Sequence, residues 1–250
     1  MKDTIRLDRL LADCGVETRS VLKEMIRKGR VAVDGTVVRD PGCQLDPAQA
    51  SVTVDGAPVA WRRRVVYLMC KPAGVITATE DPKLPTVLDL LPDTIRRMGL
   101  IPVGRLDRDT EGLLLLTNDG ALAHALLAPK KHVDKLYEAV LDREPDPDAQ
   151  ARFQEGVVLA DGTRCRPAEL ERIMPLAWEG APHPAARVTI VEGKFHQVKR
   201  MFLSVGSRVL FLRRLRMGPI RLDPGMLPGT FRLLTTEELA ALEKHAGLAD

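Results

Sequence analysis

The segment Gly104–Gly120, with the sequence GRLDRDTEGLLLLTNDG, constrains the fold of this chain more than any other. Its four consecutive leucines, Leu113–Leu116, predict a short strand that is apolar enough to lie in a core. The Asn118-Asp119-Gly120 sequence behind them is typical of a tight turn. We therefore predict a core strand with Asp107 held just ahead of it, on rigid scaffold that can position a catalytic group.

Asp107 has two less specific interpretations. Most Arg-Leu-Asp triplets are solvated charges in surface loops. The sequence Asp107-Arg108-Asp109 also imitates the Asp-x-Asp motif of aspartate phosphotransferases. In that motif an apolar strand precedes the first aspartate, but here Gly104-Arg105 occupies the place, and Thr110 follows one residue too early. The phosphotransferase interpretation is therefore disfavoured.

Length and charge set the class of protein and of partner. The 250 residues are enough for one large domain, or for a large and a small one. With 45% hydrophobic and 28% charged residues, the composition is that of a globular protein. A net charge of only +3 means that affinity for nucleic acid must come from clustered charge. Such a cluster lies between Arg187 and Arg221, where nine basic residues face the single acidic Glu192. It is either a solvated charged face or a stripe that binds phosphates in a salt-dependent manner.

Several other classes are disfavoured by missing motifs. The four cysteines are scattered, without a CxxC or paired histidines at ligand spacing, so we expect neither a zinc site nor a disulfide framework. Neither GxGxxG nor GxxxxGK[ST] occurs, so no nucleotide cofactor is expected. The N-terminus lacks an apolar signal core and no segment is long enough to cross a membrane, which predicts a cytoplasmic protein.

The first forty residues have a pattern of their own. Apolar residues at helical spacing predict a helix over Ile5–Asp13 that Gly15 stops. A second helix should begin at Thr18 or Ser20 and run to Lys28, with Gly29 in the left-handed position after it. Its expected inward face is Val21, Leu22, Met25 and Ile26. Basic side chains lie on or beside it, at Arg19, Lys23, Arg27, Lys28 and Arg30, although residues 1–60 carry nine basic and nine acidic residues.

A hairpin should follow that helix. Arg30–Val33 and Thr36–Arg39 predict two strands, and Asp34-Gly35 between them predicts the turn. Turn sequences between residues 40 and 60 then lead to a basic stretch, Trp61-Arg62-Arg63-Arg64, which we interpret as a linker.

The remainder of the chain alternates short strands and helices irregularly, which favours an α+β domain. We predict strands over Val65–Met69 and Lys135–Val140 and a short helix over Ala121–Leu127. The proline-rich segments 144–149 and 174–186 are expected to be surface loops.

A second chemically rich segment is EGKFHQVKRM, residues 192–201. From His196 onward its pattern is helical, and Gly206 should end the helix. The expected apolar face is Val198, Met201, Phe202 and Val205. Lys199 falls about 100° from that face, at its boundary with the polar side.

Taken in order, these motifs resemble the bacterial ribosomal pseudouridine synthases of the RsuA type, over nearly the whole chain. The segment from Thr18 to Gly35, with its IRKGRVAVDG sequence, resembles the small RNA-binding domain shared with ribosomal protein S4. Lys71-Pro72-Ala73-Gly74 matches the turn that opens the catalytic domain, although Cys70 stands where the family has Asn. Residues 104–120 match the segment that carries the catalytic aspartate. The HQVKRM sequence is similar to the enzymes of the small ribosomal subunit, whereas those of the large subunit typically have NRQIRRM.

The resemblance implies an α+β fold in two domains. Residues 1–60 would form the S4-like RNA-binding domain and 61–66 the basic linker. Residues 67–250 would form a pseudouridine synthase domain, built on a mixed, mainly antiparallel sheet with flanking helices.

The resemblance also implies a reaction: the isomerisation of one uridine to pseudouridine in 16S rRNA, without a cofactor or a metal. Asp107 would be the nucleophile, Lys199 its cationic partner, Tyr137 the residue that packs on the flipped base and Arg105 the residue that holds the base out of the stack. The expected RNA contacts are Arg19, Lys23, Arg27, Lys28, Arg30, Arg62, Arg63, Arg64, Lys194, His196, Gln197, Arg200, Arg214 and Arg216.

Two alternatives stay open. The target could be a uridine of 23S rRNA, or the protein could be an RNA-binding factor of ribosome assembly in which catalysis is secondary. The substrate could be free rRNA or a partly assembled small subunit, and we expect a monomer.

Overall fold

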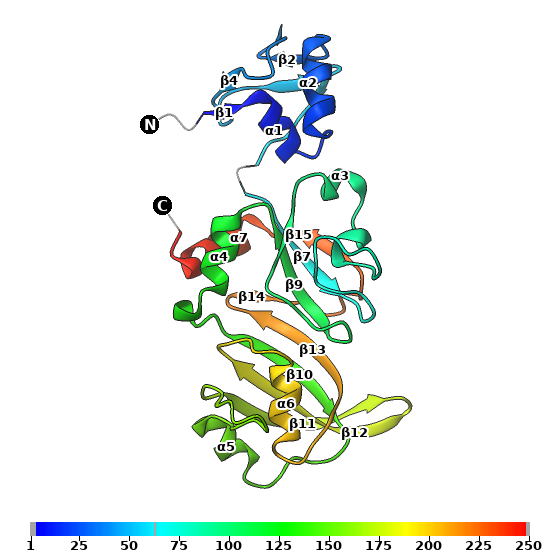
Figure 1. The fold of residues 1–250 in the computed structure, drawn as a ribbon, viewed down its shortest axis with the longest axis vertical. Helices are drawn as coiled ribbons and strands as arrows, with labels where there is room; N and C mark the ends of the chain where they lie inside the picture. Colours follow the sequence, from blue (N-terminus) through cyan, green and yellow to red (C-terminus); the bar gives the residue numbers. More distant parts are fainter. Residues whose placement is uncertain (1–3, 63, 249–250) are drawn as a thin grey trace. The chain divides into compact units, whose positions relative to one another are not determined.

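The computed structural model describes residues 4–62 and 64–248 (Figure 1). The chain divides into two compact units. The first comprises the chain as far as Val65 together with two later segments, Leu88–Ile101 and Thr117–Asp119, and the second comprises the rest. The return of those two short segments to the first unit was not apparent from the sequence.

The first unit contains a small helical pair and short strands. Its elements are β1 (Ile5–Arg6), α1 (Leu7–Asp13), α2 (Arg19–Arg27), β2 (Val31–Val33), β3 (Thr36–Val37), β4 (Gln44–Leu45), β5 (Val52–Val54), β6 (Ala57–Pro58) and α3 (Asp93–Arg96). The strands β3-β2-β5-β6 form one sheet, and β1 pairs with β4. Leucines of α1 pack with Leu22 and Ile26 of α2 in a core of their own.

Both predicted helices of this unit are present, with two differences. The first begins at Leu7, because Ile5–Arg6 pairs antiparallel with Gln44–Leu45 instead of entering the helix. On the second, Leu22, Met25 and Ile26 are buried, but Val21 is 40% exposed, so its assignment to the inward face was wrong.

The predicted turns of the first unit adopt the expected backbone. Gly29 follows α2 with a φ of +77°, the left-handed conformation that ends a helix without steric cost to glycine. Asp34 and Gly35 both have positive φ, 50° and 79°, as a two-residue hairpin turn between β2 and β3 requires.

The remaining elements follow in chain order. They are β7 (Val66–Lys71), η1 (Val87–Leu90), β8 (Ile101–Val103), β9 (Glu111–Thr117), α4 (Gly120–Leu127), η2 (Pro129–Lys131), β10 (Lys135–Leu141), α5 (Ala149–Glu155), β11 (Glu169–Trp178), β12 (Ala181–Ile190), α6 (Gln197–Leu203), β13 (Val209–Met217), β14 (Ile220–Arg221), β15 (Phe231–Leu233) and α7 (Thr236–Ala246).

One sheet organises the second unit. Its strands follow the order β11-β12-β10-β13-β9-β7-β15, with β14 beside β13 and β8 beside β9. β9 runs parallel to β13, whereas β10 is antiparallel to both β12 and β13. The sheet is therefore mixed and mainly antiparallel, with flanking helices, and the predicted fold class is confirmed.

The leucine run forms the expected buried strand. Leu113–Leu116 of β9 are fully buried, and Leu122 and Leu126 of α4 and Leu242 of α7 belong to the core cluster beside this strand. Figure 1 shows α4 and α7 next to one another. The turn behind the strand is shorter than predicted, because Gly120 is already the first residue of α4.

The prediction of a loop over residues 174–186 was wrong. These residues belong to the β11–β12 hairpin, whose turn is Glu179-Gly180. Pro175 lies in the register irregularity between Ile173 and Leu176, and Pro182 lies beyond the part of β12 that pairs with β10. A proline has no amide hydrogen to donate, so strands accept it where one side is unpaired or irregular. Residues 144–148 have no helix or strand, as predicted.

Candidate active site

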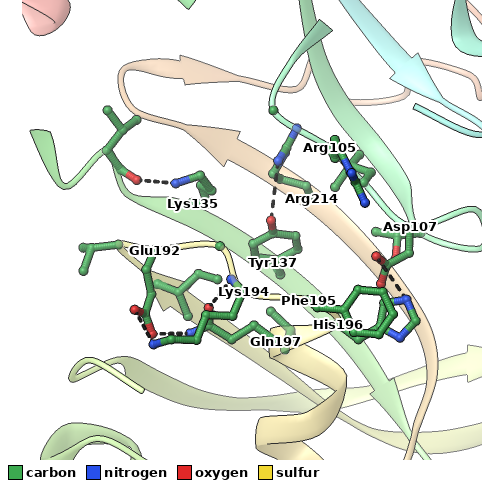
Figure 2. A pocket seen from close by; sticks show the side chains of 18 of the residues that line it. Arg105, Asp107, Lys135, Tyr137, Glu192, Lys194, Phe195, His196, Gln197 and Arg214 are labelled. Atoms are coloured by element: carbon green, nitrogen blue, oxygen red, sulfur yellow. Dashed lines mark hydrogen bonds and ion pairs between the residues drawn. The ribbon is translucent and has the colours of Figure 1, made fainter. Parts of the chain in front are cut away.

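A cavity of about 620 Å³ opens in the second unit (Figure 2). Its walls come from the loop between β8 and β9, the end of α4, the first half of β10, the segment from β12 into α6, and β13. Segments far apart in the sequence therefore meet at one place. Asp107, Tyr137, Lys199 and Arg105, the four residues predicted to be catalytic, all line this cavity.

Asp107 lies in the loop between β8 and β9, with 27% of its side chain exposed. Lys199 Nζ is 3.3 Å from Asp107 Oδ2, and His196 Nε2 is 3.5 Å from Asp107 Oδ1. The structure thus brings Lys199 to the aspartate that the resemblance implies, and adds an imidazole that sequence reasoning had assigned only to RNA contact. The Asp107 carboxylate therefore lies between the Lys199 ammonium and the His196 imidazole, which hold it in position on the cavity wall.

Lys199 serves a second carboxylate. Its Nζ donates to Asp109 Oδ1 at 2.5 Å, closer than its contact with Asp107. Burial alone would raise the pKa of the Asp109 carboxyl, but the Lys199 hydrogen bond holds that pKa below its ordinary value. Lys199 therefore bridges the two ends of the Asp107-Arg108-Asp109 triplet and orients the loop relative to α6.

The Asp107 loop is also held from behind by the Lys71-Pro72-Ala73-Gly74 turn. Lys71 is fully buried, and its ammonium donates to the carbonyl oxygens of Pro72, Arg108 and Thr110 at 2.9, 3.3 and 3.0 Å. The backbone amide of Gly74 donates to Arg108 O at 2.8 Å. Because burial removes the ammonium from water, the pKa of Lys71 falls to about 8. The Lys71-Pro72-Ala73-Gly74 motif thus positions the loop that carries Asp107.

The start of α6 places two rings at the edge of the cavity. His196 precedes the helix with a φ of 47°, and its ring stacks on that of Phe195 at a centroid distance of 3.8 Å. Phe195 is 69% exposed. Sequence analysis assigned no role to this exposed ring, although its place between Lys194 and His196 was an available signal.

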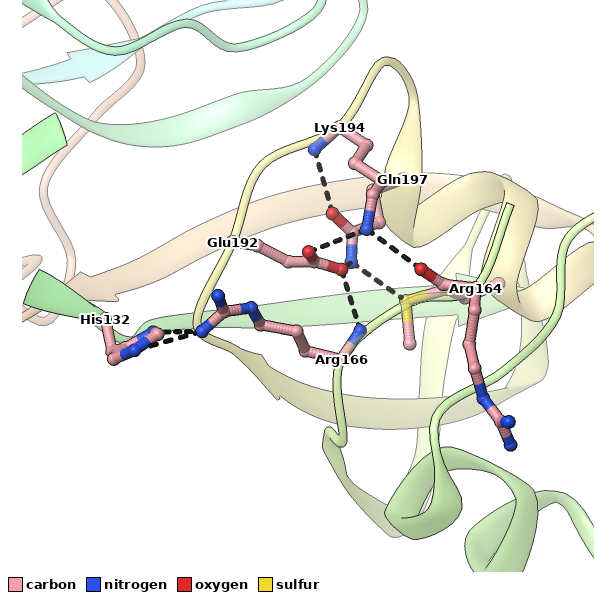
Figure 3. Close-up of polar contacts among 7 residues, drawn as sticks. His132, Arg164, Arg166, Glu192, Lys194 and Gln197 are labelled. Atoms are coloured by element: carbon pink, nitrogen blue, oxygen red, sulfur yellow. Dashed lines mark hydrogen bonds and ion pairs between the residues drawn. The ribbon is translucent and has the colours of Figure 1, made fainter. Parts of the chain in front are cut away.

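Glu192 and Gln197 form a polar network behind this turn (Figure 3). Glu192 accepts hydrogen bonds from Lys194 Nζ at 2.7 Å, Gln197 Nε2 at 2.8 Å and the backbone amide of Arg166 at 3.0 Å. Gln197 Oε1 in turn accepts from the backbone amide of Lys194 at 2.8 Å. Gln197 is only 4% exposed, so the structure makes it a brace of the turn; a contact with RNA, as predicted, would need the turn to open.

The opposite wall carries Tyr137, which is 7% exposed, and two further cations. Lys135 and Tyr137 are two residues apart on β10 and therefore share a face of the sheet. Arg214 of β13 lies directly across from Tyr137 in the antiparallel register and is 1% exposed. Burial, together with the nearby Arg214, lowers the pKa of Lys135 to about 8. Arg105 is exposed on the side of Asp107, as Figure 2 shows.

The cluster of basic residues between Arg187 and Arg221 is largely paired within the protein. Arg216 contacts Asp134 at 2.5 Å, Arg187 contacts Glu138 at 3.1 Å, and Arg200 pairs with Asp161. Lys194 and Lys199 are bound as described above, and Arg214 is buried. The segment is thus not an unpaired stripe of surface charge, because acidic residues distant in sequence fold against it. The predicted RNA contacts of Lys194, His196, Arg200, Arg214 and Arg216 stay predictions.

The first unit contrasts with this segment. Its five predicted contacts are all exposed: Arg19, Lys23, Arg27, Lys28 and Arg30. In the linker, Arg62 is exposed and Arg64 pairs with Asp119 at 2.5 Å, while Arg63 lies outside the described residues.

No helix in the described parts of the chain has the length and apolarity needed to cross a membrane. Among those same residues there is no cluster of acidic, histidine and cysteine side chains suited to a metal ion.

Comparisons with known proteins agree on one family. Residues 65–204 match the family model described as RNA pseudouridylate synthase, and residues 5–50 match the S4 domain. The chain is 43% identical over 240 residues to the Uncharacterized RNA pseudouridine synthase YtzG of Bacillus subtilis, covering 96% of this chain and 99% of the relative. It is 40% identical over 240 residues to the Ribosomal small subunit pseudouridine synthase A of Salmonella typhimurium, with 95% and 100% covered.

One solved structure is similar to this protein over nearly the whole chain. The crystal structure of a pseudouridylate synthase superposes with a TM-score of 0.64 at 30% identity, over 95% of this chain and 99% of that one. The sequence motifs, the mixed sheet and the cavity around Asp107 are thus found in a chain that matches one family from end to end. This protein belongs to the RNA pseudouridylate synthases and carries an S4 domain ahead of its catalytic domain.

Proposed function

We propose that this protein converts one uridine of 16S rRNA to pseudouridine, with Asp107 as the nucleophile and the target base flipped into the cavity. The choice of 16S rRNA is supported by the relatives of Salmonella typhimurium and Escherichia coli, 40% and 39% identical, whose names specify the small ribosomal subunit. The HQVKRM sequence of α6 points the same way.

The observation that carries the proposal is the position of Asp107. Its carboxylate lies on the cavity wall between Lys199 and His196, and the same cavity is lined by the buried ring of Tyr137. In this arrangement a flipped uridine has its base against Tyr137 and its ribose near the carboxylate. Asp107 can then attack the sugar at C1′ or take a proton from the ribose.

Flipping a base costs a few kcal/mol, and least in a loop or at an unpaired position. Arg105, exposed beside Asp107, is suited to occupy the space that the uridine leaves. Residues 1–60 would dock on the RNA through the exposed cations of α2, residues 61–66 would be the linker, and residues 67–250 would carry the reaction. We further propose a cytoplasmic monomer that acts on free rRNA or on an assembling small subunit.

Tritium release from [5-³H]uridine-labelled rRNA tests the proposal, because forming the new carbon–carbon bond displaces the hydrogen at C5. We expect the wild type to release tritium from small-subunit RNA, and Asp107→Asn to release none while its RNA affinity is retained. Release only from large-subunit RNA would overturn the 16S assignment and keep the reaction. If Asp107→Asn complements every phenotype of a deletion strain, the protein acts mainly as an assembly factor.

A further inference from the structure

We propose that Arg214 is a catalytic residue whose guanidinium donates to a carbonyl oxygen of the flipped uracil and stabilises the negative charge that develops on the ring. The inference rests on the proposed isomerase function and does not depend on which rRNA carries the target.

Arg214 is a buried cation whose hydrogen bonding is incomplete. It is 1% exposed, and its Nε donates to the carbonyl oxygen of Leu113 at 2.7 Å. Its Nη1 lies 3.5 Å from Tyr137 Oη, a long contact. Its Nη2 is buried and has no hydrogen-bond partner among the described residues. A buried charge without a counter-ion costs free energy unless something else satisfies it.

Two other arginines of β13, Arg213 and Arg216, have different surroundings from those of Arg214. Arg213 donates to the carbonyl oxygen of Met226 at 3.0 Å and contacts Cys70 Sγ at 3.5 Å. Arg216, two residues further on, has Asp134. Arg214 alone among these three lines the cavity. Arg213 Nε and Arg216 Nε are likewise buried without a partner among the described residues, so an unpaired donor does not by itself distinguish Arg214. Of these three unpaired donors, only Arg214 Nη2 belongs to a side chain that lines the cavity, where a ligand can reach it.

The sheet holds Arg214 in this position before any substrate arrives. Gly112 of β9 is the parallel partner of Arg214, and a Cβ at Gly112 would lie 2.3 Å from Arg214 O. Only glycine allows the two backbones this approach, at a φ of +98°. With Nε anchored on Leu113 as well, the guanidinium is preorganised, which is the condition under which a donor stabilises a transition state most.

The chemistry of the ligand follows from Tyr137. The Arg214 Cζ atom lies 6.0 Å from the centroid of the Tyr137 ring, on the strand directly opposite. A flipped base that packs on Tyr137 would turn one of its carbonyl edges to Arg214. The base is the part of the substrate that flipping carries into a pocket, whereas RNA phosphates stay on the backbone outside. A uracil carbonyl therefore fits this buried donor better than a phosphate does.

The charge arises when the bond between C1′ and N1 breaks. The electron pair of that bond remains on the uracil, which becomes an anion with its charge shared by N1, O2 and O4. After the ring rotates, C5 forms the new bond to C1′, C5 releases its proton and N1 gains one, so the isomerisation is balanced without another reactant. A guanidinium at O2 or O4 stabilises the anion more than neutral uracil, and so accelerates the step.

Single-turnover kinetics on labelled rRNA test this role. We expect Arg214→Gln to slow isomerisation by about 10²- to 10³-fold, the usual loss for one preorganised donor, with RNA affinity unchanged. Arg214→Lys should recover part of the rate because it keeps the charge but not the fork. Arg213→Gln is the matched control: it removes an arginine from the same strand and should keep the wild-type rate. Thermal unfolding of all three shows which variants are folded.

A leaving-group comparison separates catalysis from structure. RNA that contains 5-fluorouridine has a base that bears negative charge more readily, so cleavage of its C1′–N1 bond depends less on Arg214. The rate deficit of Arg214→Gln should therefore be smaller on 5-fluorouridine RNA than on uridine RNA. A residue that only supports the sheet would give the same deficit on both substrates.

Three outcomes overturn the proposal, and they differ from one another. If Arg214→Gln and Arg214→Lys are both folded and both keep the wild-type rate, the role is excluded. Equal rate deficits of Arg214→Gln on uridine RNA and 5-fluorouridine RNA would exclude it as well. In either case the isomerase function stands, because wild type is active and Asp107→Asn is not. If wild type and Asp107→Asn are equally inactive on all rRNA, the proposed function fails and the role of Arg214 fails with it.

Discussion

Helix α2 and the segment from Arg187 to Arg221 are both rich in basic residues, but their cations have different surroundings. The five cations on or beside α2 are exposed. Lys28 pairs with Glu24 and Arg30 with Asp55 at the surface, and the exposed Arg19 lies 3.7 Å from the buried Asp8. In the second segment Lys199, Arg200 and Arg216 are each paired with an aspartate, and Arg214 is buried. Clustered charge in a sequence therefore does not by itself identify a surface that binds RNA.

The geometry of the two elements explains the contrast. α2 buries one apolar side against α1 and turns its remaining sides to water, so its long basic side chains reach solvent. β13 lies inside the sheet with β10 and β9 on either side. Its side chains are half-buried or buried, and Leu212 and Arg214 line the cavity. The fold supplies aspartate partners to Lys199, Arg200 and Arg216, but it leaves the buried Nη2 of Arg214 without an acceptor among the described residues. We infer that α2 contributes affinity for RNA and that the second segment contributes catalysis.

The largest effect expected from this contrast is the loss of Lys199. Lys199→Met removes the cation from Asp107 and Asp109, and should slow single-turnover isomerisation by about 10²- to 10³-fold with little change in RNA affinity. Lys199→Arg should retain much of the rate. A Lys199→Met protein that binds RNA weakly but turns over at the wild-type rate would reverse the inferred division of roles.

Removing exposed cations from α2 should have the opposite outcome. Lys23→Gln with Arg27→Gln should weaken RNA binding and make the dependence of log K on log [salt] shallower by about 1.5, for two lost phosphate contacts. The rate with bound RNA should not change. The double variant Arg143→Gln with Lys244→Gln removes the same charges from exposed sites of the catalytic unit and is the control. Equal losses in the two double variants would show that only net charge matters.

Burial of cations in the catalytic unit should also appear in the pH dependence of stability. The pKa of Lys71 is about 8 in the folded protein, against an ordinary value of 10.5, because the ammonium is buried. Between these values the unfolded chain binds more protons, so the free energy of unfolding should rise with pH above about 8. Denaturant unfolding from about pH 7 to about pH 9.5 measures this rise. Lys71→Met should reduce it and leave the part that comes from Lys135, whose pKa burial also lowers to about 8. A free energy of unfolding that falls over this range would contradict the assignment.

The smallest effect is expected for a paired arginine near the surface. Arg187, with 42% of its side chain exposed, contacts Glu138 across β12 and β10. Arg187→Gln should lower the free energy of unfolding by no more than about 1 kcal/mol and leave the salt dependence of RNA binding unchanged. If the salt dependence falls as much as it does for the α2 variants, Arg187 contacts RNA despite its pairing.

Local patterns were sufficient for much of the fold. The leucine run of β9, the helix from Gln197 to Leu203 and the Asp34-Gly35 turn follow from periodicity and backbone preference, which are properties of adjacent residues. The error at residues 174–186 has a physical cause as well. Prolines indicate loops on average, but a strand tolerates them where its amides need no partner, and only the pairing of β12 with β10 and β11 shows where that is.

The sequence by itself determined the family, the two-domain composition and the identity of Asp107, Tyr137 and Lys199 as the candidate catalytic residues, because ordered motifs survive as local patterns. Only the tertiary structure decided which of the described basic side chains have acidic partners within the protein. The acidic partners of Arg216, Arg187 and Arg200 are distant from them in sequence: they are Asp134, Glu138 and Asp161. Neither sequence segment by itself predicts these pairs. In the sequence, Arg214 is one of nine basic residues between Arg187 and Arg221. Only the pairing of β13 with β10 and β9 places its side chain as a buried donor at the cavity. Pairing and burial depend on contacts between distant segments, which form only when the sheet does.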